Sequence, residues 1–218
     1  MTKDVNVYEA CDKAIKAMNR QLVEDFGKLR LTKWDEVNII KTVIAVYRAS
    51  VRKARKRYYD VAFDAYLIMM AMCEIPPDKA RRMAEEAITR AWVDNVLEEV
   101  DPVTLYCFDT ETDRKAYRLA ESLEVTKDIL YEIDKAMHLW SRQLGQYAIN
   151  MTDYAMIQAL QDAGYDECEW VTQRDEKVCG TCGSRDGKVY RLEDIPVKHP
   201  NCRCYVKPRK KVLNGNAV

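Results

Sequence analysis

The chain has 218 residues, of which 48% are hydrophobic, and its 35 basic residues balance 35 acidic ones. This length suits one large domain, or one domain with a small appendix. The sequence contains no apolar run of 18 residues and no signal peptide, so we expect no membrane-spanning helix and synthesis in a cytoplasm.

The balanced total hides an uneven distribution of charge. Residues 1–60 and 171–218 each carry a net charge of +6, whereas residues 61–170 carry −12. This pattern excludes a protein that coats nucleic acid along its whole length, but the two basic ends could contact phosphate. The alternative is that the three segments neutralise one another, within the fold or between copies.

Apolar residues recur every three or four positions through most of residues 1–165, which predicts a mainly α, elongated helical body. A first helix is expected over 5–27. A long helix is expected over about 33–74, because nothing interrupts the pattern between Thr32, a candidate N-cap, and Pro76-Pro77. At 1.5 Å per residue it would measure about 60 Å, which is typical of a stalk or an interaction element.

Further helices are expected in the rest of the body, with a short extended piece between them. The expected segments are a helix over 77–99, the extended piece over 103–108, a helix over 110–123, and a helix over 126–164 that bends near Gly145. Gly164 is a typical residue for the end of the last helix.

The long helix contains the stretch AYLIMMAM, residues 65–72, which is richer in apolar residues than one buried face requires. Packing against another helix, from the same chain or from a partner, would explain this composition. Tyr66, Met69 and Met70 are therefore candidate partner contacts.

The character of the sequence changes after Gly164. The pair Asp186-Gly187 is a strong signal for a hairpin turn, and three prolines between 196 and 208 exclude long helices there. We therefore predict a small module over 166–208 that contains a β-hairpin, followed by a flexible basic and polar tail over 209–218.

This module holds five of the best soft metal ligands that a protein can offer: Cys179, Cys182, His199, Cys202 and Cys204. The first two form a CxxC turn, and 16 residues separate this pair from His199, which is close to the usual spacing of a tetrahedral zinc site. The set Cys179, Cys182, His199 and Cys202 is preferred, with Cys204 as the substitute. Four protein ligands leave no position for a substrate water, so a structural zinc is predicted rather than a catalytic one.

Two other interpretations of the cluster remain open. The cysteines could form disulfides after release into an oxidising exterior, or they could remain reduced thiols without a metal. The other cysteines stand alone in apolar surroundings and are predicted to be small buried hydrophobes. These are Cys11, Cys73, Cys107 and Cys168.

Three motifs in the C-terminal third occur in the order and approximate spacing of one known family. They are WVTxxDxxVCxxC beginning at Trp170, DGKVY beginning at Asp186, and PxxHPNCRC beginning at Pro196. With the helical run before them, they cover about residues 140–208. In this region the chain resembles the phage Mu F-like minor head proteins, also called phage head morphogenesis proteins.

The resemblance implies a structural role in building a phage head. The implied protein is a minor capsid protein of the virion, docked at the portal vertex, present in several copies and assembled in the host cytoplasm. The implied partners are the portal protein or the major capsid protein, with packaged DNA as a further partner. Many relatives have two prolines before the histidine, whereas this chain has Ile195-Pro196-Val-Lys there. This difference puts the shape of the loop in doubt, but it does not affect the ligand residues.

Two basic segments are candidate contacts for DNA phosphate. They comprise Arg52, Lys53, Arg55, Lys56 and Arg57 in the long helix, and Lys207, Arg209, Lys210 and Lys211 near the end of the chain. Tyr58 or Tyr59 would then stack on bases. A solvated helix face, or a face paired with the acidic middle segment, is the simpler interpretation.

Signals for catalysis are poor, since the sequence contains no glycine-rich phosphate loop, no GxSxG and no HExxH. We therefore expect no enzyme activity. The rival to a structural head protein is a zinc module that binds nucleic acid during DNA packaging or ejection. Its candidate contacts are Arg185, Lys188, Arg191, Lys198, Arg203 and the basic tail.

Overall fold

The computed structural model describes residues 7–28, 36–126, 128–173 and 176–209, with residues 36–40 described by their backbone alone. The fold is mainly helical with a small C-terminal sheet, as predicted. The helices are α1 (Glu9–Gly27), α2 (Glu36–Met72), α3 (Pro77–Ala87), α4 (Arg90–Glu98), α5 (Phe108–Val125), α6 (Ile129–Asp162), α7 (Gly180–Gly183) and the short 3-10 helix η1 (Leu192–Asp194). The strands are β1 (Glu167–Val171), β2 (Val189–Arg191) and β3 (Tyr205–Pro208).

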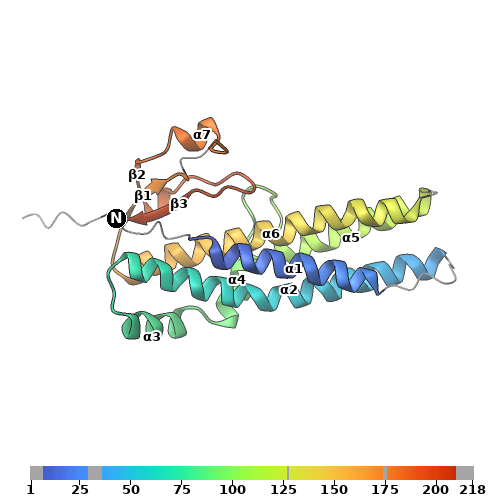
Figure 1. Cartoon of the computed structure of the whole chain (residues 1–218), viewed down its shortest axis with the longest axis horizontal. Helices are drawn as coiled ribbons and strands as arrows, with labels where there is room; N and C mark the ends of the chain where they lie inside the picture. Colours follow the sequence, from blue (N-terminus) through green and yellow to red (C-terminus); the bar gives the residue numbers. More distant parts are fainter. Residues whose placement is uncertain (1–6, 29–35, 127, 174–175, 210–218) are drawn as a thin grey trace, which may run out of the picture.

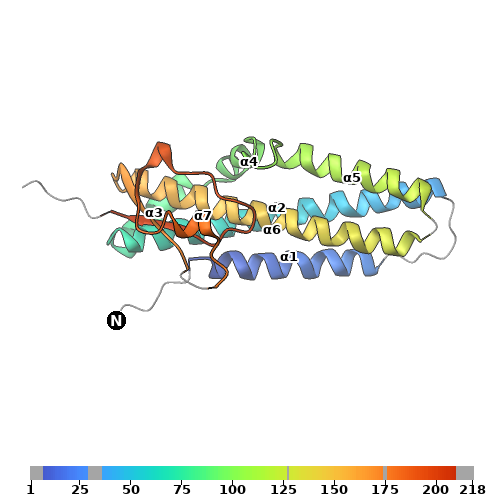
Figure 2. The same ribbon diagram turned by 90° about the horizontal axis from the view of Figure 1, so that it is seen from above.

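Four helices, α1, α2, α5 and α6, lie side by side along the long axis of an elongated bundle (Figures 1 and 2). The most extensive helix–helix interface is between α2 and α6. There Tyr47 of α2 stacks on Trp140 of α6, with ring centroids 3.7 Å apart. The Tyr47 hydroxyl donates a hydrogen bond to Gln143 Oε1 at 2.8 Å, so the buried phenol has a partner.

Helix α2 has 37 residues and confirms the predicted long helix, although the candidate cap Thr32 lies outside the described residues. Its apolar stretch packs within the same chain. Tyr66, Met69 and Met70 each have 0% exposure, and the Tyr66 hydroxyl donates to Asp162 Oδ2 at 2.6 Å. The prediction that these three side chains contact a partner protein is therefore wrong, because the bundle core already covers them.

The helix predicted over 77–99 is in fact two helices, α3 and α4. The chain turns at Ile88, which is extended and fully buried, and at Thr89, whose hydroxyl caps α4 by accepting from Trp92 N at 3.1 Å. The extended piece predicted over 103–108 is also wrong. Asp101 instead organises this segment as turns, because its carboxylate accepts from the backbone N–H groups of Val103 and Thr104.

Helix α6 is continuous over 34 residues and passes through Gly145, where a Cβ atom would lie 3.7 Å from the Ile15 side chain of α1. The predicted end at Gly164 is confirmed. Gly164 adopts φ +76°, and Tyr165 N donates to Leu160 O at 2.9 Å, a pairing typical of a glycine helix end. No helix among the described residues is long and apolar enough to cross a membrane.

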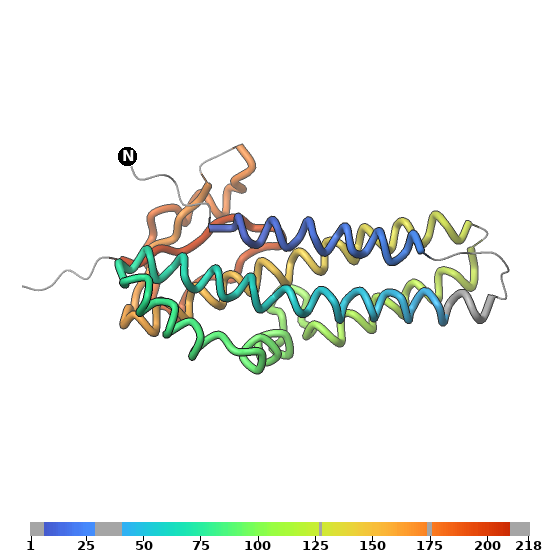
Figure 3. Tube along the Cα trace, turned by 60° about the horizontal axis from the view of Figure 1, so that its bottom comes forward, coloured from blue at the N-terminus to red at the C-terminus, as the bar shows by residue number. Residues whose placement is uncertain are grey.

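The three strands form one antiparallel sheet in the order β2-β1-β3. The turn at Asp186-Gly187 is confirmed, since Gly187 has φ +74° and Lys188 N donates to Arg185 O at 2.9 Å. It does not close a simple hairpin, because α7 occupies the segment before it and β2 pairs with β1. The module packs on the end of the bundle where α1 begins (Figure 3).

Candidate metal centre

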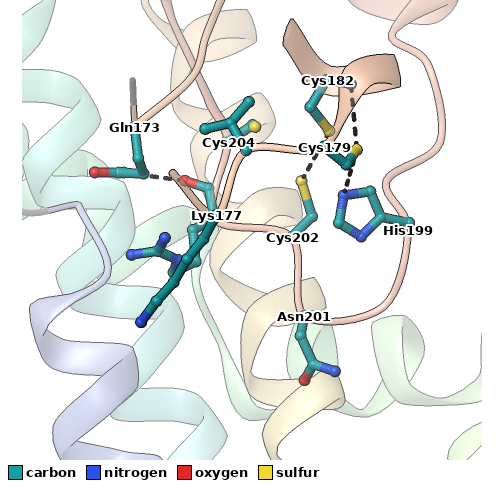
Figure 4. A pocket seen from close by; sticks show the side chains of 10 residues that line it. Gln173, Lys177, Cys179, Cys182, His199, Asn201, Cys202 and Cys204 are labelled. Carbon is teal, nitrogen blue, oxygen red and sulfur yellow. Dashed lines mark hydrogen bonds between the residues drawn. The ribbon is translucent and has the colours of Figure 1, made fainter. Parts of the chain in front are cut away.

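The five candidate ligands converge from two segments of the module (Figure 4). Cys179 is the N-cap of α7 and Cys182 lies within it, whereas the other three lie between η1 and β3. The CxxC turn is fixed by its own backbone, because Cys182 N donates to Cys179 Sγ at 3.4 Å. An N–H group aimed at a sulfur favours the thiolate, which is the form that binds metal.

The distances between donor atoms are close to those of a tetrahedral site. Cys179 Sγ lies 3.4 Å from His199 Nε2, and Cys182 Sγ lies 3.6 Å from Cys202 Sγ. With Zn–S bonds of about 2.3 Å, tetrahedral geometry would place two sulfurs roughly 3.8 Å apart. The arrangement therefore fits a metal ion without large movement of these pairs.

Cys182 is the member common to two compact triplets of donor atoms. In one it stands with Cys179 and His199, and in the other with Cys202 and Cys204; within each triplet all donor atoms lie within 4.8 Å of one another. Any set of four ligands therefore draws on both triplets, and Cys182 is the one residue that belongs to both. The cluster around Cys182, Cys202 and Cys204 could hold a metal, and the choice between Cys204 and the other donors stays open.

A small cavity of about 30 Å³ lies among these donors. This volume is that of a single ion or water rather than of an organic substrate. The five ligands line it together with polar side chains that include Gln173, Lys177 and Asn201. Gln173 is fixed to the same loop, since its amide donates to Arg203 O at 3.0 Å.

The cluster has one exposed side and one buried side, and the thiol pKa values differ accordingly. The backbone N–H of Cys182 and the nearby His199 lower the pKa of the exposed Cys179. Burial raises the pKa of Cys182, and it raises the pKa of Cys204 to about 11. Without a metal, the thiols of Cys182 and Cys204 therefore hold their protons, and binding of a metal to either would release its proton.

The cysteines are free thiols throughout the chain. The prediction for the four isolated cysteines holds for Cys11, Cys73 and Cys168, which are buried, whereas Cys107 is only half-buried. The 3.6 Å between the sulfurs of Cys182 and Cys202 exceeds a disulfide bond of about 2.05 Å.

Trp170 forms the small core of the module with three of the ligands, Cys182, Cys202 and Cys204. Its indole Nε1 is the one buried side-chain polar atom without a hydrogen-bond partner among the described residues. Metal-bound thiolates are commonly stabilised by N–H groups around them. An unpaired indole donor packed against three cysteines is thus a further feature that suits a metal–thiolate centre.

A buried polar triad, which the sequence analysis missed, attaches this site to the bundle. The Tyr8 hydroxyl lies 2.8 Å from Asp153 Oδ1 and 2.9 Å from Cys204 O, so its single proton is shared between these two acceptors, and Lys198 Nζ donates to the same carboxylate at 2.6 Å. Burial raises the pKa of Tyr8 and that of Asp153, although Lys198 partly offsets the effect on Asp153. The triad joins the start of α1, the C-terminal third of α6 and the ligand loop.

The predicted DNA contacts are scattered, and several are already paired with carboxylates. Lys53 binds Asp25 at 2.8 Å, and Arg55 binds Asp94 at 2.9 Å, so part of the basic helix face neutralises acidic segments. Exposed members of the same segment are Arg52 and Lys56. Arg57 is half-buried.

The two tyrosines proposed to stack on bases also make contacts within the fold. Tyr58 is fully buried and donates to Leu144 O, so it cannot stack on a base; Tyr59 is half-buried and stacks on Phe63.

In the C-terminal module, cations are also engaged within the fold. Lys207 pairs with Glu169 and Arg209 with Glu167, each at 2.8 Å, whereas Lys210 and Lys211 lie outside the described residues. Arg191 pairs with Glu193, and Lys198 belongs to the triad. Arg185 lies over the Trp170 ring, and Lys188 is exposed.

Comparison with known proteins gave one match. The family model described as phage Mu protein F like protein matches residues 119–207, from the second half of α5 to β3. No curated protein and no solved structure matched the chain. The matched region contains all five candidate ligands, and it also includes the whole of α6. Over residues 119–207 this chain is therefore similar to the phage Mu F-like family.

Proposed function

We propose that the chain is a structural component of a phage head, a minor capsid or head morphogenesis protein that docks at the portal vertex. The observation that carries this proposal is the family match over residues 119–207. The docking partner would be the portal protein or the major capsid protein, and the protein would be present in several copies per virion. The proposed role is architectural rather than catalytic.

Within that role, the metal centre would bind zinc as a staple. The module has a small core built from Trp170 and three ligand cysteines, and small cores of this kind need a metal or a disulfide for stability. Cys179, Cys182, His199 and Cys202 are the proposed ligands, with Cys204 as the substitute. A bound zinc would tie the CxxC turn to the ligand loop, and four protein ligands would leave it no water to activate.

Contact with packaged DNA remains a proposal for Arg52, Lys56 and the basic end of the chain. Charge reversal at Arg52 and Lys56 is expected to impair DNA retention if this contact exists. The rival function, a nucleic-acid-binding zinc module, receives less support because Arg191 and Lys198 pair with carboxylates and Arg185 lies over the Trp170 ring.

The head role is tested in the phage that encodes the chain. We expect the protein in purified heads at a few copies per particle, and we expect particles made without it to be defective in assembly or infectivity. Heads that contain none of the protein, or full infectivity without it, would contradict the role.

The zinc staple is tested by the metal content of the full chain purified under reducing conditions. One zinc per chain is expected, and Cys182→Ser should lose it because Cys182 belongs to both donor triplets. Cys107→Ser, outside the cluster, is the control and should keep it. Retention in Cys204→Ser but loss in Cys202→Ser would support the preferred ligand set, and the reverse would make Cys204 a ligand in place of Cys202. A wild-type chain without metal would refute the staple.

A further inference from the structure

Two adjoining hollows form a groove between α5 and α6 that begins beside the ligand loop of the metal centre. It contains two hollows of about 240 and 260 Å³. Both are lined by Lys115 of α5 and Leu139 of α6, so they adjoin. The first also reaches Pro200 and Asn201 of the ligand loop. We call this feature the α5/α6 groove.

One face of α6 supplies most of the groove wall. The lining positions on this helix recur at three- and four-residue intervals from Glu132 to Gln146. At 1.5 Å per residue these positions span roughly 21 Å, or about four helical turns. A groove of this length along a helix pair matches a short helical segment better than it matches a compact small molecule.

The floor of the second hollow is apolar, because Leu119, Ala136 and Trp140 line it as buried residues. The buried lining of the first hollow is mostly polar. Leu139 stands between the two hollows and is 46% exposed. A partly exposed leucine between two hollows is the kind of position that an apolar side chain of a partner would cover.

The charge that the groove presents to solvent is mainly positive. Arg118 and Arg142 line it and are exposed, whereas the other two lining cations, Lys135 and Lys115, pair with Glu132 and Glu111. The carboxylates of the lining are less available. Glu132 pairs with Lys135 at 3.7 Å, and Asp101 is buried and hydrogen-bonded to Asn150.

Glu111 is likewise unavailable, because it is buried between Arg114 and Lys115. The groove therefore favours an anionic occupant.

We propose that the α5/α6 groove binds an acidic amphipathic helix of another protein, with apolar side chains over Leu139 and carboxylates beside Arg118 and Arg142. Duplex DNA is a poorer match, because it would meet the cations but would leave the apolar floor uncovered. The inference deepens the proposed docking role and rests on it for the statement that the partner is another head component. The binding itself requires only the purified chain.

The test uses two designed, fluorescently labelled 16-residue helical peptides and the full chain. Both peptides carry leucines along one face; one has glutamates beside that face and the other has lysines. Fluorescence anisotropy is expected to give saturable binding of the acidic peptide with a Kd below about 100 µM, and much weaker binding of the basic one. Leu139→Glu should weaken acidic-peptide binding by at least about tenfold.

Two matched controls separate the groove from the general surface. Leu130→Glu is the control for Leu139→Glu. It changes a 64% exposed leucine of the same helix that does not line the groove, and it should leave binding unchanged.

The charge of the groove is tested separately. Arg118→Glu with Arg142→Glu should weaken binding of the acidic peptide by at least about tenfold. The pair Arg20→Glu with Arg82→Glu, on exposed positions of α1 and α3, should not.

Three results would overturn the inference: no saturable binding by the wild-type chain, equal binding of both peptides, or loss of binding by Leu130→Glu as well as by Leu139→Glu. DNA binding that depends on Arg118 and Arg142 but not on Leu139 would also overturn it, in favour of a phosphate contact. Peptide binding by a chain that is missing from phage heads would refute the head role alone. A chain that is present in functional heads but binds no peptide would refute the groove alone.

Discussion

Glu111 shows how a single carboxylate can be held in its charged form inside this bundle. Its side chain is 3% exposed, and it lies 2.6 Å from Arg114 Nε and 3.1 Å from Lys115 Nζ. Burial by itself would raise the pKa of Glu111, but the hydrogen bonds from these two cations lower it on balance. A carboxylate whose pKa is lower in the folded state stabilises the fold above its unfolded pKa, and this contribution is lost as the pH falls through the folded value.

We therefore expect Glu111→Gln to lower the free energy of unfolding at pH 7 by about 1–3 kcal/mol, because it leaves two cations without their carboxylate. The unfolded pKa of glutamate is about 4.3, so the difference from wild type should shrink between about pH 5 and pH 3. Urea denaturation at pH 7, 5 and 3 measures both effects.

Glu9→Gln is the control, since Glu9 pairs with Lys13 but is 60% exposed. Its effect should be much smaller than that of Glu111→Gln, because solvent screens an exposed ion pair. A Glu111→Gln effect of the same size at all three pH values would show that the lost contribution is packing and not charge.

The ligands of the candidate metal centre could be predicted because their identity and spacing are local properties of the sequence. Only two residues separate Cys179 from Cys182 in the sequence, and the Asp186-Gly187 turn returns the chain toward β1. The attachment of the site could not be predicted in this way. Tyr8 contacts Asp153 and the backbone of Cys204 across 145 and 196 residues of sequence, and nothing local marks these residues as partners.

At the level of elements, the boundary between α3 and α4 shows where periodicity is insufficient. The segment from 77 to 99 contains no proline or glycine after its first residue, so its pattern predicts a single helix. The chain leaves the helix at Ile88, which is extended and completely buried. Thr89 then caps α4. Threonine is a favoured N-cap residue, but the residues around Thr89 in the sequence do not indicate that a helix begins there.

Thr89→Ala is expected to lower the free energy of unfolding by about 1 kcal/mol, because Trp92 N loses its acceptor. Hydrogen exchange at the first turn of α4 should accelerate. Thr89→Ser retains a hydroxyl at the cap and should remain close to wild type. If alanine and serine behave alike, the break is held by the burial of Ile88 and not by the cap.

Tertiary packing also decides the role of the apolar stretch in α2. The sequence predicts Tyr66, Met69 and Met70 as partner contacts, because their apolar stretch is richer than one buried face requires. Packing of α2 within the bundle buries all three. Accessible apolar surface lies elsewhere, at positions such as Leu139. The periodicity of the sequence does not predict this exposure, because Leu139 faces a groove rather than the core.

At the level of the whole molecule, the two ends of the described chain meet at one site. The beginning of α1 supplies Tyr8, the C-terminal third of α6 supplies Asp153, and the ligand loop supplies Lys198. Lys198 Nζ also lies 5.8 Å from the centroids of the Tyr8 and Trp170 rings. The module therefore rests on a polar contact shared by three distant segments, so its position should depend on the first turn of α1 as well as on any metal.

Tyr8→Phe tests this dependence by removing one oxygen atom and keeping the ring. The variant leaves Asp153 with one partner fewer and the carbonyl of Cys204 without its donor, so we expect a loss of about 1–3 kcal/mol in the free energy of unfolding. Hydrogen exchange should accelerate in β3 and at the start of α1 more than in the centre of α2. Tyr131→Phe, on a 60% exposed ring, is the control and should change neither measurement. Unchanged exchange in β3 would mean that the module is held by the sheet and its apolar contacts with the bundle, and that the triad orients the ligand loop without anchoring it.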